Sequence, residues 1–348
     1  MNQKKRNNFF TNTINLIAIA TLVVMFALSS YAQPMPDFLF MSYNVENLFD
    51  TIDNPNKNDE EFLPTSKRNW NSYRYQRKIT NLSKVIVAVS ENWHSPDLIG
   101  LCEIENDTCL KDLIQRTNLY KLHYKYIHYE SEDPRGIDVA MLYNEETFVP
   151  LNHCSMRVIF DDSTRKTRDI LYVKGINKST KDTIHIFQCH FPSRRGGKDV
   201  SEKFRMTAAS FVRMKIDSLF AENPFVKIIV AGDFNDYPID RSIVEGLQAQ
   251  KEGSMCEQCL INLDDKTAEG THKFQGEWGF LDQAMVSNGF VRDYEIHYTV
   301  FKNDFLLQTS EKSGETSPRR TYVGTFYKGG ISDHLPIVVS FKEIRNKR

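Results

Sequence analysis

Short, continuously apolar runs recur along the chain, and most of them end at a polar residue. Runs of this kind, without helical spacing, predict strands that are buried on both faces. We expect strands at 38–43, 97–102, 124–129, 137–143, 157–160, 170–176, 183–189, 228–230, 279–286, 294–300, 301–308 and 337–341.

Two longer segments carry apolar residues at spacings of three and four, which is typical of amphipathic helices. The first covers residues 72–93, with Ile79, Leu82 and Val85 on its apolar face, and the second covers residues 201–221. Shorter helices are expected at 110–117 and 238–250, whereas 51–69 and 311–320 are polar and predict loops. Strands interspersed with amphipathic helices predict an α/β sandwich.

The first 32 residues have the order of a secretory signal. Basic residues at 4–6 precede an uncharged apolar run at 14–28, and the small-x-small triplet Ser-Tyr-Ala ends at Ala32. This pattern predicts a signal peptide at 1–32, cleavage after Ala32, and a periplasmic or extracellular domain at 33–348. An uncleaved signal anchor is the alternative, and the missing Cys after the apolar run argues against a lipid anchor.

Charge and cysteine content limit which binding partners and which kinds of cross-link the chain can have. Cleavage leaves 41 basic and 45 acidic residues, a net charge of −4, so the domain as a whole has no electrostatic bias toward nucleic acid. Six cysteines in a chain of this length do not make a disulfide scaffold. Cys256 and Cys259 form a C-x-x-C, for which a structural disulfide or two free thiols are favoured over half of a zinc site.

Polar residues stand where the apolar runs stop. The run at 228–230 leads through Gly232 to Asp233 and Asn235, which alternation along a strand would point the same way. Glu103 ends another run, and a buried carboxylate there needs a partner. The remaining members of this set are Asn44, His190, Asp282, Asp333 and His334.

This set predicts a metal and proton-transfer site at one face of the sandwich. Oxygen ligands such as Glu103 and Asp333 suit Mg²⁺ or Mn²⁺, and the two histidines suit proton transfer near neutral pH. Basic residues in nearby loops could contact phosphate oxygens; the candidates are Arg135, Arg194, Arg195, Lys198, Arg319 and Arg320. The chain has no P-loop and no G-x-G-x-x-G, so no nucleotide cofactor is indicated.

The segments NVENLFD, GLCEIEN, GDFND, LDQ and SDHLP, with a strand ending in His190, occur in this order between residues 37 and 343. The chain thereby resembles the endonuclease/exonuclease/phosphatase superfamily, the metal-dependent phosphoesterases related to deoxyribonuclease I. The resemblance implies a four-layer α/β sandwich, two packed mixed β-sheets flanked by helices, with one active site at the sheet edges.

The resemblance also implies roles for individual residues. Glu103 would be the main ligand of the Mg²⁺ or Mn²⁺ ion, with Asn44 and Asp333 beside it. Asp233 and Asn235 would orient the attacking water and the phosphate. The general base would be His334, held by Asp282, and His190 would bind phosphate or serve the leaving group. Which histidine is base and which is acid stays open.

For the substrate, the similarity to secreted bacterial nucleases favours DNA or RNA, and we expect a monomeric enzyme without a membrane span after cleavage. The acidic composition weakens this choice, because nucleases gain affinity by neutralising several phosphates. The alternative is a phosphodiesterase or phosphatase on lipid headgroups or small phosphoesters, like the sphingomyelinase and inositol-phosphatase relatives. A binding protein with a dead site is the third class, disfavoured by the intact polar set.

Overall fold

A computed structural model describes residues 35–90, 94–254, 256–311 and 314–344, and the part of the chain from Pro36 onward forms one compact unit. The expected signal peptide at 1–32 lies outside the described residues. Within the described ranges, no helix combines the length and apolar character needed to cross a bilayer.

Two large sheets form the centre of this unit. The six-stranded sheet has the order β14-β19-β1-β2-β4-β3 and the seven-stranded sheet the order β5-β6-β7-β8-β13-β10-β9. Both are mixed, because β1–β2, β7–β8 and β9–β10 are parallel and the other pairs antiparallel. Strands of the first sheet are β1 (Phe38–Leu48), β2 (Leu98–Ile104), β3 (Tyr124–His128), β4 (Asp138–Asn144), β14 (Tyr294–Val300) and β19 (Ile337–Glu343). Strands of the second are β5 (Phe148–Met156), β6 (Ile170–Asn177), β7 (Thr183–His190), β8 (Lys227–Asp233), β9 (Ala249–Lys251), β10 (Leu260–Asn262) and β13 (Asp282–Ser287).

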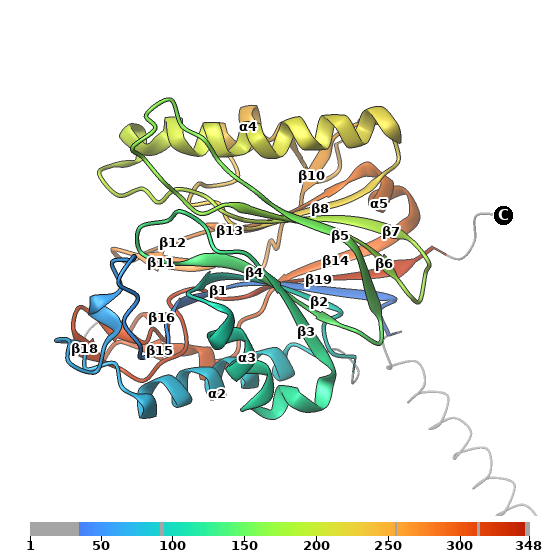
Figure 1. The fold of residues 1–348 in the computed structure, drawn as a ribbon. Coiled ribbons are helices and arrows are strands. Elements are labelled where there is room, and N and C mark those ends of the chain that lie inside the picture. Colours follow the sequence, from blue (N-terminus) through green and yellow to red (C-terminus); the bar gives the residue numbers. More distant parts are fainter. Residues whose placement is uncertain (1–34, 91–93, 255, 312–313, 345–348) are drawn as a thin grey trace, which may run out of the picture. The chain divides into compact units, whose positions relative to one another are not determined.

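Helices cover the outer faces of the two sheets. Helix α4 (Lys198–Glu222) lies along the seven-stranded sheet, and α2 (Ser72–Ala88) and α3 (Asp107–Gln115) lie against the six-stranded sheet (Figure 1). A short α5 (Asn288–Asp293) follows β13. This arrangement confirms the expected four-layer α/β sandwich. Three small hairpins complete the fold: β11 (His272–Phe274) with β12 (Glu277–Gly279), β15 (Leu307–Thr309) with β16 (Thr316–Pro318), and β17 (Tyr322–Val323) with β18 (Phe326–Tyr327).

The position of β8 between two apolar layers explains its unbroken hydrophobic run. Ile228 and Val230 pack with Val212 of α4, while Ile229 and Ala231 belong to the core that contains the inner faces of both sheets. All four side chains are fully buried. A strand with apolar neighbours on both faces has no reason to alternate, so its sequence reads as a continuous run.

Four of the expected elements are wrong. The segment 311–320, expected to be a loop, contains strand β16, which pairs with β15. Residues 157–160 are not a strand. The strand of this region is β5, which ends at Met156 and whose mostly exposed residues give no apolar run. The helix expected at 238–250 is a single turn at Ser242–Gly246. It is followed by β9, in which Ala249 pairs with Leu260 of β10. The strand expected at 301–308 contains a 3₁₀ turn at Asp304–Leu306, and further 3₁₀ turns lie at Glu60–Phe62 and Asn118–Leu122.

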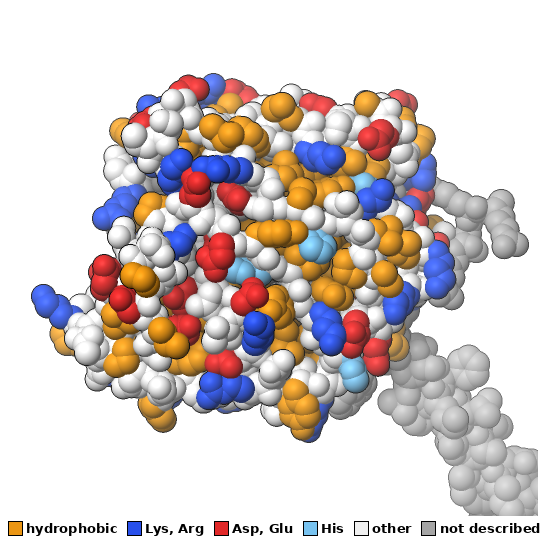
Figure 2. Space-filling view, viewed as in Figure 1, with side chains coloured by type: hydrophobic (Ala, Val, Ile, Leu, Met, Phe, Trp, Pro, Cys, Tyr) orange, Lys and Arg blue, Asp and Glu red, His pale blue; other side chains and the backbone are white. Residues whose placement is uncertain are grey.

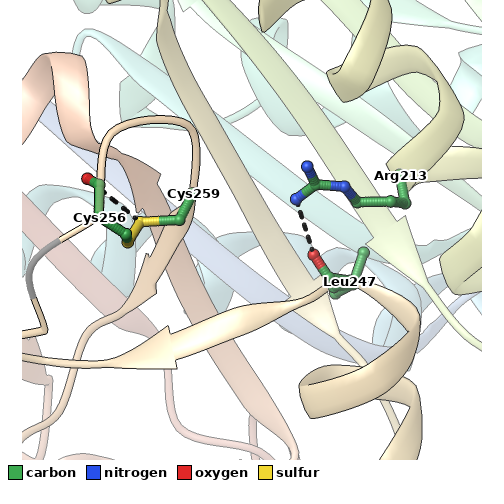
Figure 3. The surroundings of a disulfide bond; sticks show 4 residues. All are labelled: Arg213, Leu247, Cys256 and Cys259. Carbon is green, nitrogen blue, oxygen red and sulfur yellow. Dashed lines mark hydrogen bonds between the residues drawn. A yellow bond between two sulfur atoms is a disulfide. The ribbon is translucent and has the colours of Figure 1, made fainter. Parts of the chain in front are cut away.

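Cys256 and Cys259 form a disulfide just before β10 (Figure 3). The C-x-x-C is therefore the structural bridge, and both sulfur atoms are used in it. In the same view Arg213 of α4 donates to the carbonyl oxygen of Leu247 at 3.3 Å, which ties the helix to the segment after the Ser242–Gly246 turn.

Candidate active site

Strand pairing places three of the predicted residues side by side on the seven-stranded sheet. His190 ends β7 and pairs with Asp233, which ends β8. Asp233 in turn pairs with Asp282, the first residue of β13. The strand expected at 279–286 therefore begins later, at Asp282, because β12 ends at Gly279.

The six-stranded sheet contributes the next residues at the same place. The side-chain amide of Asn44, in β1, donates to Asp233 Oδ2 at 3.0 Å and lies 3.4 Å from Glu103 Oε1 of β2. The buried side chain of Asn44 thus links the edges of the two sheets directly. The side chains predicted from separate strand ends thus meet at the line where the two sheets pack.

Glu103 reaches this point through a β-bulge. Cys102 pairs with Val139 and Ile104 pairs with Asp138, so Glu103 between them has no partner on β4. Its φ of +68° is unusual for a residue with a side chain, and such strain concentrates at functional sites. The carboxylate is fixed by the backbone N–H of Asn47, which donates to Glu103 Oε2 at 2.8 Å.

His334 is held by a short contact to Asp282. Its Nδ1 lies 2.7 Å from Asp282 Oδ2, and its backbone N–H donates to Ser332 Oγ at 3.0 Å. Burial alone would lower the pKa of His334, but the carboxylates of Asp282, Asp233 and Asp333 raise it well above its ordinary value. Its Nε2 faces the site, 3.9 Å from Asp233 Oδ2 and 4.0 Å from Asp333 Oδ1.

The pKa of His190 is shifted in the opposite direction. Burial and the positive charges of Arg168 and Arg135 lower its pKa well below the ordinary value, so the ring is neutral near pH 7. Its Nε2 lies 3.5 Å from Asp233 Oδ2, and its buried Nδ1 has no hydrogen-bond partner. The pKa values of the two histidines are therefore shifted in opposite directions: the carboxylates raise that of His334, and burial lowers that of His190.

Asp233 and Asn235 form a turn in which side-chain alternation no longer holds. Asp233 Oδ1 accepts from the backbone N–H of Asn235 at 2.9 Å, and Asn235 has a φ of +50°. The Asn235 amide donates to the carbonyl oxygen of Phe191 at 3.1 Å. Asn235 therefore ties the loop after β8 to the loop after β7.

The carboxylates of the site fit a divalent cation. Burial, with a contribution from Asp282, raises the pKa of Asp233 to about 7, and burial and Asp333 do the same for Glu46. Arg320 lies 2.6 Å from Asp333 Oδ2 and 3.6 Å from Glu46 Oε1, so one cation already offsets part of this charge. Crowded buried carboxylates and an amide oxygen are the donors that Mg²⁺ and Mn²⁺ prefer.

The three predicted phosphate-binding arginines lie in different environments. Arg194 is occupied by neighbours: its guanidinium lies 3.0 Å from Asp240, donates to the Asn235 carbonyl at 2.7 Å, and stacks over Tyr237. Arg135 is 42% exposed and lies 3.5 Å from Asp133. Arg195 is exposed in the loop before α4.

Sequence reasoning missed two residues of the site. The ring of His272 in β11 packs against that of His334 in a tilted arrangement, with centroids 4.6 Å apart, and burial and the charge of His334 lower the pKa of His272 to about 4. Arg168 is fully buried and donates to the carbonyl oxygen of Phe191 at 2.6 Å. Neither residue stands at the end of an apolar run, so strand-end position could not indicate them.

Comparisons with known proteins agree with this fold. The endonuclease/exonuclease/phosphatase family matches residues 40–343. Among solved structures, a mannosyl-6-phosphatase from Bacteroides thetaiotaomicron is 16% identical, with a TM-score of 0.54, over 87% of this chain and 99% of that chain. The human Nocturnin catalytic domain with bound sulfate anion is 15% identical, with a TM-score of 0.53, over 89% and 96%. TDP2 from Caenorhabditis elegans is 16% identical, with a TM-score of 0.54, over 88% and 97%.

At these identities the structural likeness shows the fold alone. The comparison with curated proteins gives no match. The family match, however, spans nearly the whole of the compact unit and includes every residue of the site. The chain belongs to the endonuclease/exonuclease/phosphatase family of metal-dependent phosphoester hydrolases.

Proposed function

We propose that this phosphoesterase acts on small or terminal phosphate esters, by attack of a water molecule at the site where the two sheets meet. The observation that carries the choice of substrate is the pairing of the cations around the site with carboxylates of the chain itself.

Asn44, Glu103 and Asp333 would hold the Mg²⁺ or Mn²⁺ ion, which would stabilise charge developing on the phosphate oxygens as a Lewis acid. The position of Glu103 is fixed by its bulge and by the Asn47 N–H. Asn44 is fixed by its contacts to Glu103 and Asp233. These ligands are therefore preorganised by the backbone and by each other.

Proton transfer falls to His334. Its Nδ1 is held by Asp282, so Nε2 is the atom that exchanges a proton with the attacking water or the leaving group. Asp233 Oδ2 lies near Nε2 of both histidines and would orient the water. Neutral His190 keeps an N–H that can donate to a phosphate oxygen without adding a second positive charge.

The electrostatics favour a compact substrate over a long polyanion. Arg194 and Lys198 both bind Asp240, and Arg320 binds Asp333, so these cations are partly neutralised. Acidic and basic side chains are interspersed on the face shown in Figure 2. A nuclease gains affinity by neutralising several phosphates in a row, whereas a single phosphoester needs only the site itself.

Nucleic acid is the second candidate, and two residues favour it. Arg135 and Arg195 have exposed guanidinium groups in loops beside β4 and β7, where they could contact phosphates that flank the scissile bond. The sequence resemblance to secreted nucleases points the same way. Among the described residues, no contact favours a lipid headgroup specifically.

Turnover and its salt dependence separate these substrates. The purified protein, with Mg²⁺ or Mn²⁺, is assayed on p-nitrophenyl phosphate, bis-nitrophenyl phosphate, a sugar 6-phosphate, plasmid DNA, RNA and sphingomyelin vesicles. We expect the small soluble esters to have the highest kcat/KM, with less than about a fourfold change between 50 and 200 mM salt, because a single phosphate has no condensed counterions to release. Rapid cleavage of DNA or RNA that falls steeply with salt would favour the nuclease, and cleavage of sphingomyelin alone would favour the lipid enzyme.

Two variants test the site itself. Glu103→Gln and His334→Ala should each lower kcat/KM at least about 100-fold while leaving the far-UV circular dichroism and melting temperature close to those of the wild type. Glu60→Gln, on the surface turn after β1, is the matched control and should keep full activity. Near-wild-type turnover by either site variant would contradict the proposed mechanism.

We also propose that the chain is exported, with cleavage after Ala32, and that residues 33–348 act as a monomeric catalytic domain. The order of basic, apolar and small residues at the N-terminus supports export. N-terminal sequencing of the protein recovered outside the cytoplasm of a bacterial host should begin at Gln33. Recovery of the intact chain in the membrane fraction would indicate the signal anchor instead.

A further inference from the structure

A second group of potential metal ligands lies between β3 and β4. His128 is the last residue of β3, Asp138 is the first residue of β4, and Glu130 lies in the loop that joins them. One ligand atom from each residue can be chosen so that all three lie within 4.8 Å of one another. None of these residues belongs to the set of Asn44, Glu103 and Asp333.

Two polar atoms in this group are buried without partners. The side chains of His128 and Asp138 are each 2% exposed, and His128 Nε2 lies 3.6 Å from Asp138 Oδ2. Neither atom has a hydrogen-bond partner. Buried polar atoms are nearly always satisfied, and an unfilled ion position is one of the few explanations when they are not.

The other atoms of both side chains are fixed so that these two atoms face each other. His128 Nδ1 lies 3.0 Å from Asp107 Oδ1, which leaves Nε2 directed into the gap. Asp138 Oδ1 accepts from the backbone N–H of Ser131 at 3.0 Å, which leaves Oδ2 free. A carboxylate behind a histidine is the arrangement that commonly orients metal-binding imidazoles.

The spacing suits a tetrahedral ion. A zinc ion lies about 2.1 Å from nitrogen and oxygen ligands, and at a tetrahedral angle two such ligands are about 3.4 Å apart. The observed 3.6 Å between His128 Nε2 and Asp138 Oδ2 matches this separation, and it exceeds a normal hydrogen bond. Glu130 is exposed and can close the position from the solvent side.

We propose that His128, Glu130 and Asp138 bind one divalent transition-metal ion of the zinc type, with water as the fourth ligand, separately from the catalytic ion. An imidazole nitrogen among the ligands disfavours Ca²⁺ and Mg²⁺, which take oxygen ligands. The ion would join the end of β3 to the start of β4. It would thereby restrain the loop between them, which carries Asp133 and Arg135 at the edge of the active site.

Zinc binding is measured in a protein whose catalytic site is already altered. The Glu103→Gln protein is stripped with a chelator and titrated with ZnCl₂ by calorimetry, with bound zinc counted after equilibrium dialysis. We expect one zinc ion per chain. In the same background, Glu130→Gln and Asp138→Asn should each weaken binding at least tenfold, and CaCl₂ should give no competing signal. Asp107→Asn, behind the histidine, should weaken zinc binding by about 10-fold or more.

Glu132→Gln is the matched control, because Glu132 lies in the same loop, is also exposed and forms ion pairs with Arg157 and Lys166. It should leave zinc affinity unchanged. Glu130 is a surface residue, so its variant remains informative even if Asp138→Asn fails to fold. Zinc binding that is absent below 100 µM, or that is equal in the Glu130→Gln and Glu132→Gln proteins, would overturn the proposal and leave a direct His128–Asp138 ion pair.

Discussion

At the scale of single residues, the contact between Asp282 and His334 decides what the site can do. The 2.7 Å distance and the burial of both side chains fix which ring nitrogen faces the substrate. An amide in place of the carboxylate would keep the shape but could present its N–H₂ to Nδ1 and turn the tautomer around. In the proposed mechanism this carboxylate also stabilises the imidazolium form of His334.

Asp282→Asn should therefore lower kcat by about 100-fold or more, with little change in KM, because the change affects proton transfer and not substrate binding. Asp264→Asn, an exposed aspartate in the segment before β11, serves as the control and should behave as the wild type. The measurement is steady-state kinetics on the best small ester, with melting temperature as a check on folding. A loss confined to KM would assign Asp282 to substrate binding.

The residues of this site were predictable where they end apolar runs and unpredictable where they do not. Glu103, His190 and Asp233 follow continuous hydrophobic strands, so their position was visible in the sequence. His272 belongs to a three-residue hairpin strand and reaches the site through a β-bridge and a ring contact with His334, which lies 62 positions further along the chain. Such a contact depends on tertiary packing, and no local pattern encodes it.

At the scale of elements, the pairing of the parallel strands β7 and β8 leaves no room for a side chain at Gly232. This glycine has a φ of +138°, and a Cβ built on it would lie 1.8 Å from the carbonyl oxygen of Cys189. The Cys189 oxygen and the Gly232 backbone are held in the middle of a sheet, so neither can move at low energetic cost. The same register pairs His190 with Asp233.

Gly232→Ala should consequently destabilise the protein by about 3 kcal/mol or more, the sum of a strained φ and an overpacked contact, or prevent soluble expression. Gly276→Ala is the control: Gly276 also has a positive φ, +91°, but a Cβ there meets no atom within 4 Å. Only the backbone strain of about 1 kcal/mol should remain at that position. Urea unfolding measures both variants, and equal losses would show that the contact with Cys189 is relaxed.

Helices and strands were predictable from the sequence where their burial requires a continuous or periodic pattern of apolar residues. The runs that became β1, β2 and β8 are buried on both faces and were visible, whereas the half-exposed edge strand β5 was not. The segment after Pro238 has helical composition, but Ala249 pairs with Leu260 and tertiary pairing ends the turn early. In this segment, strand pairing at the edge of the sheet outweighs the local preference for a helix.

At the scale of the whole molecule, stability against acid depends on histidines that fold in a neutral state. His185 of β7 is buried, and its Nδ1 lies 2.7 Å from the hydroxyl group of Tyr172, which can donate to it. Burial, with the charges of Lys174 and Lys215, lowers its pKa to about 4. The unfolded chain has no such environment, so its histidine titrates near the ordinary value of about 6.5.

The sign of the effect follows from proton uptake. Above about pH 6.5 His185 is neutral in both states, and between about 6.5 and 4 only the unfolded chain binds the proton, which favours unfolding. Lowering the pH from 7 to 4.5 should therefore cost the wild type about 2 kcal/mol through this residue, after a discount for partial solvent access. His185→Gln should lose that much less of its unfolding free energy over the same interval, because glutamine can accept the Tyr172 hydrogen bond but does not titrate. His297→Gln, at an exposed position on β14, should follow the wild type. Urea unfolding at the two pH values gives the comparison, and parallel losses in the wild type and His185→Gln would mean that His185 takes up its proton within the folded protein.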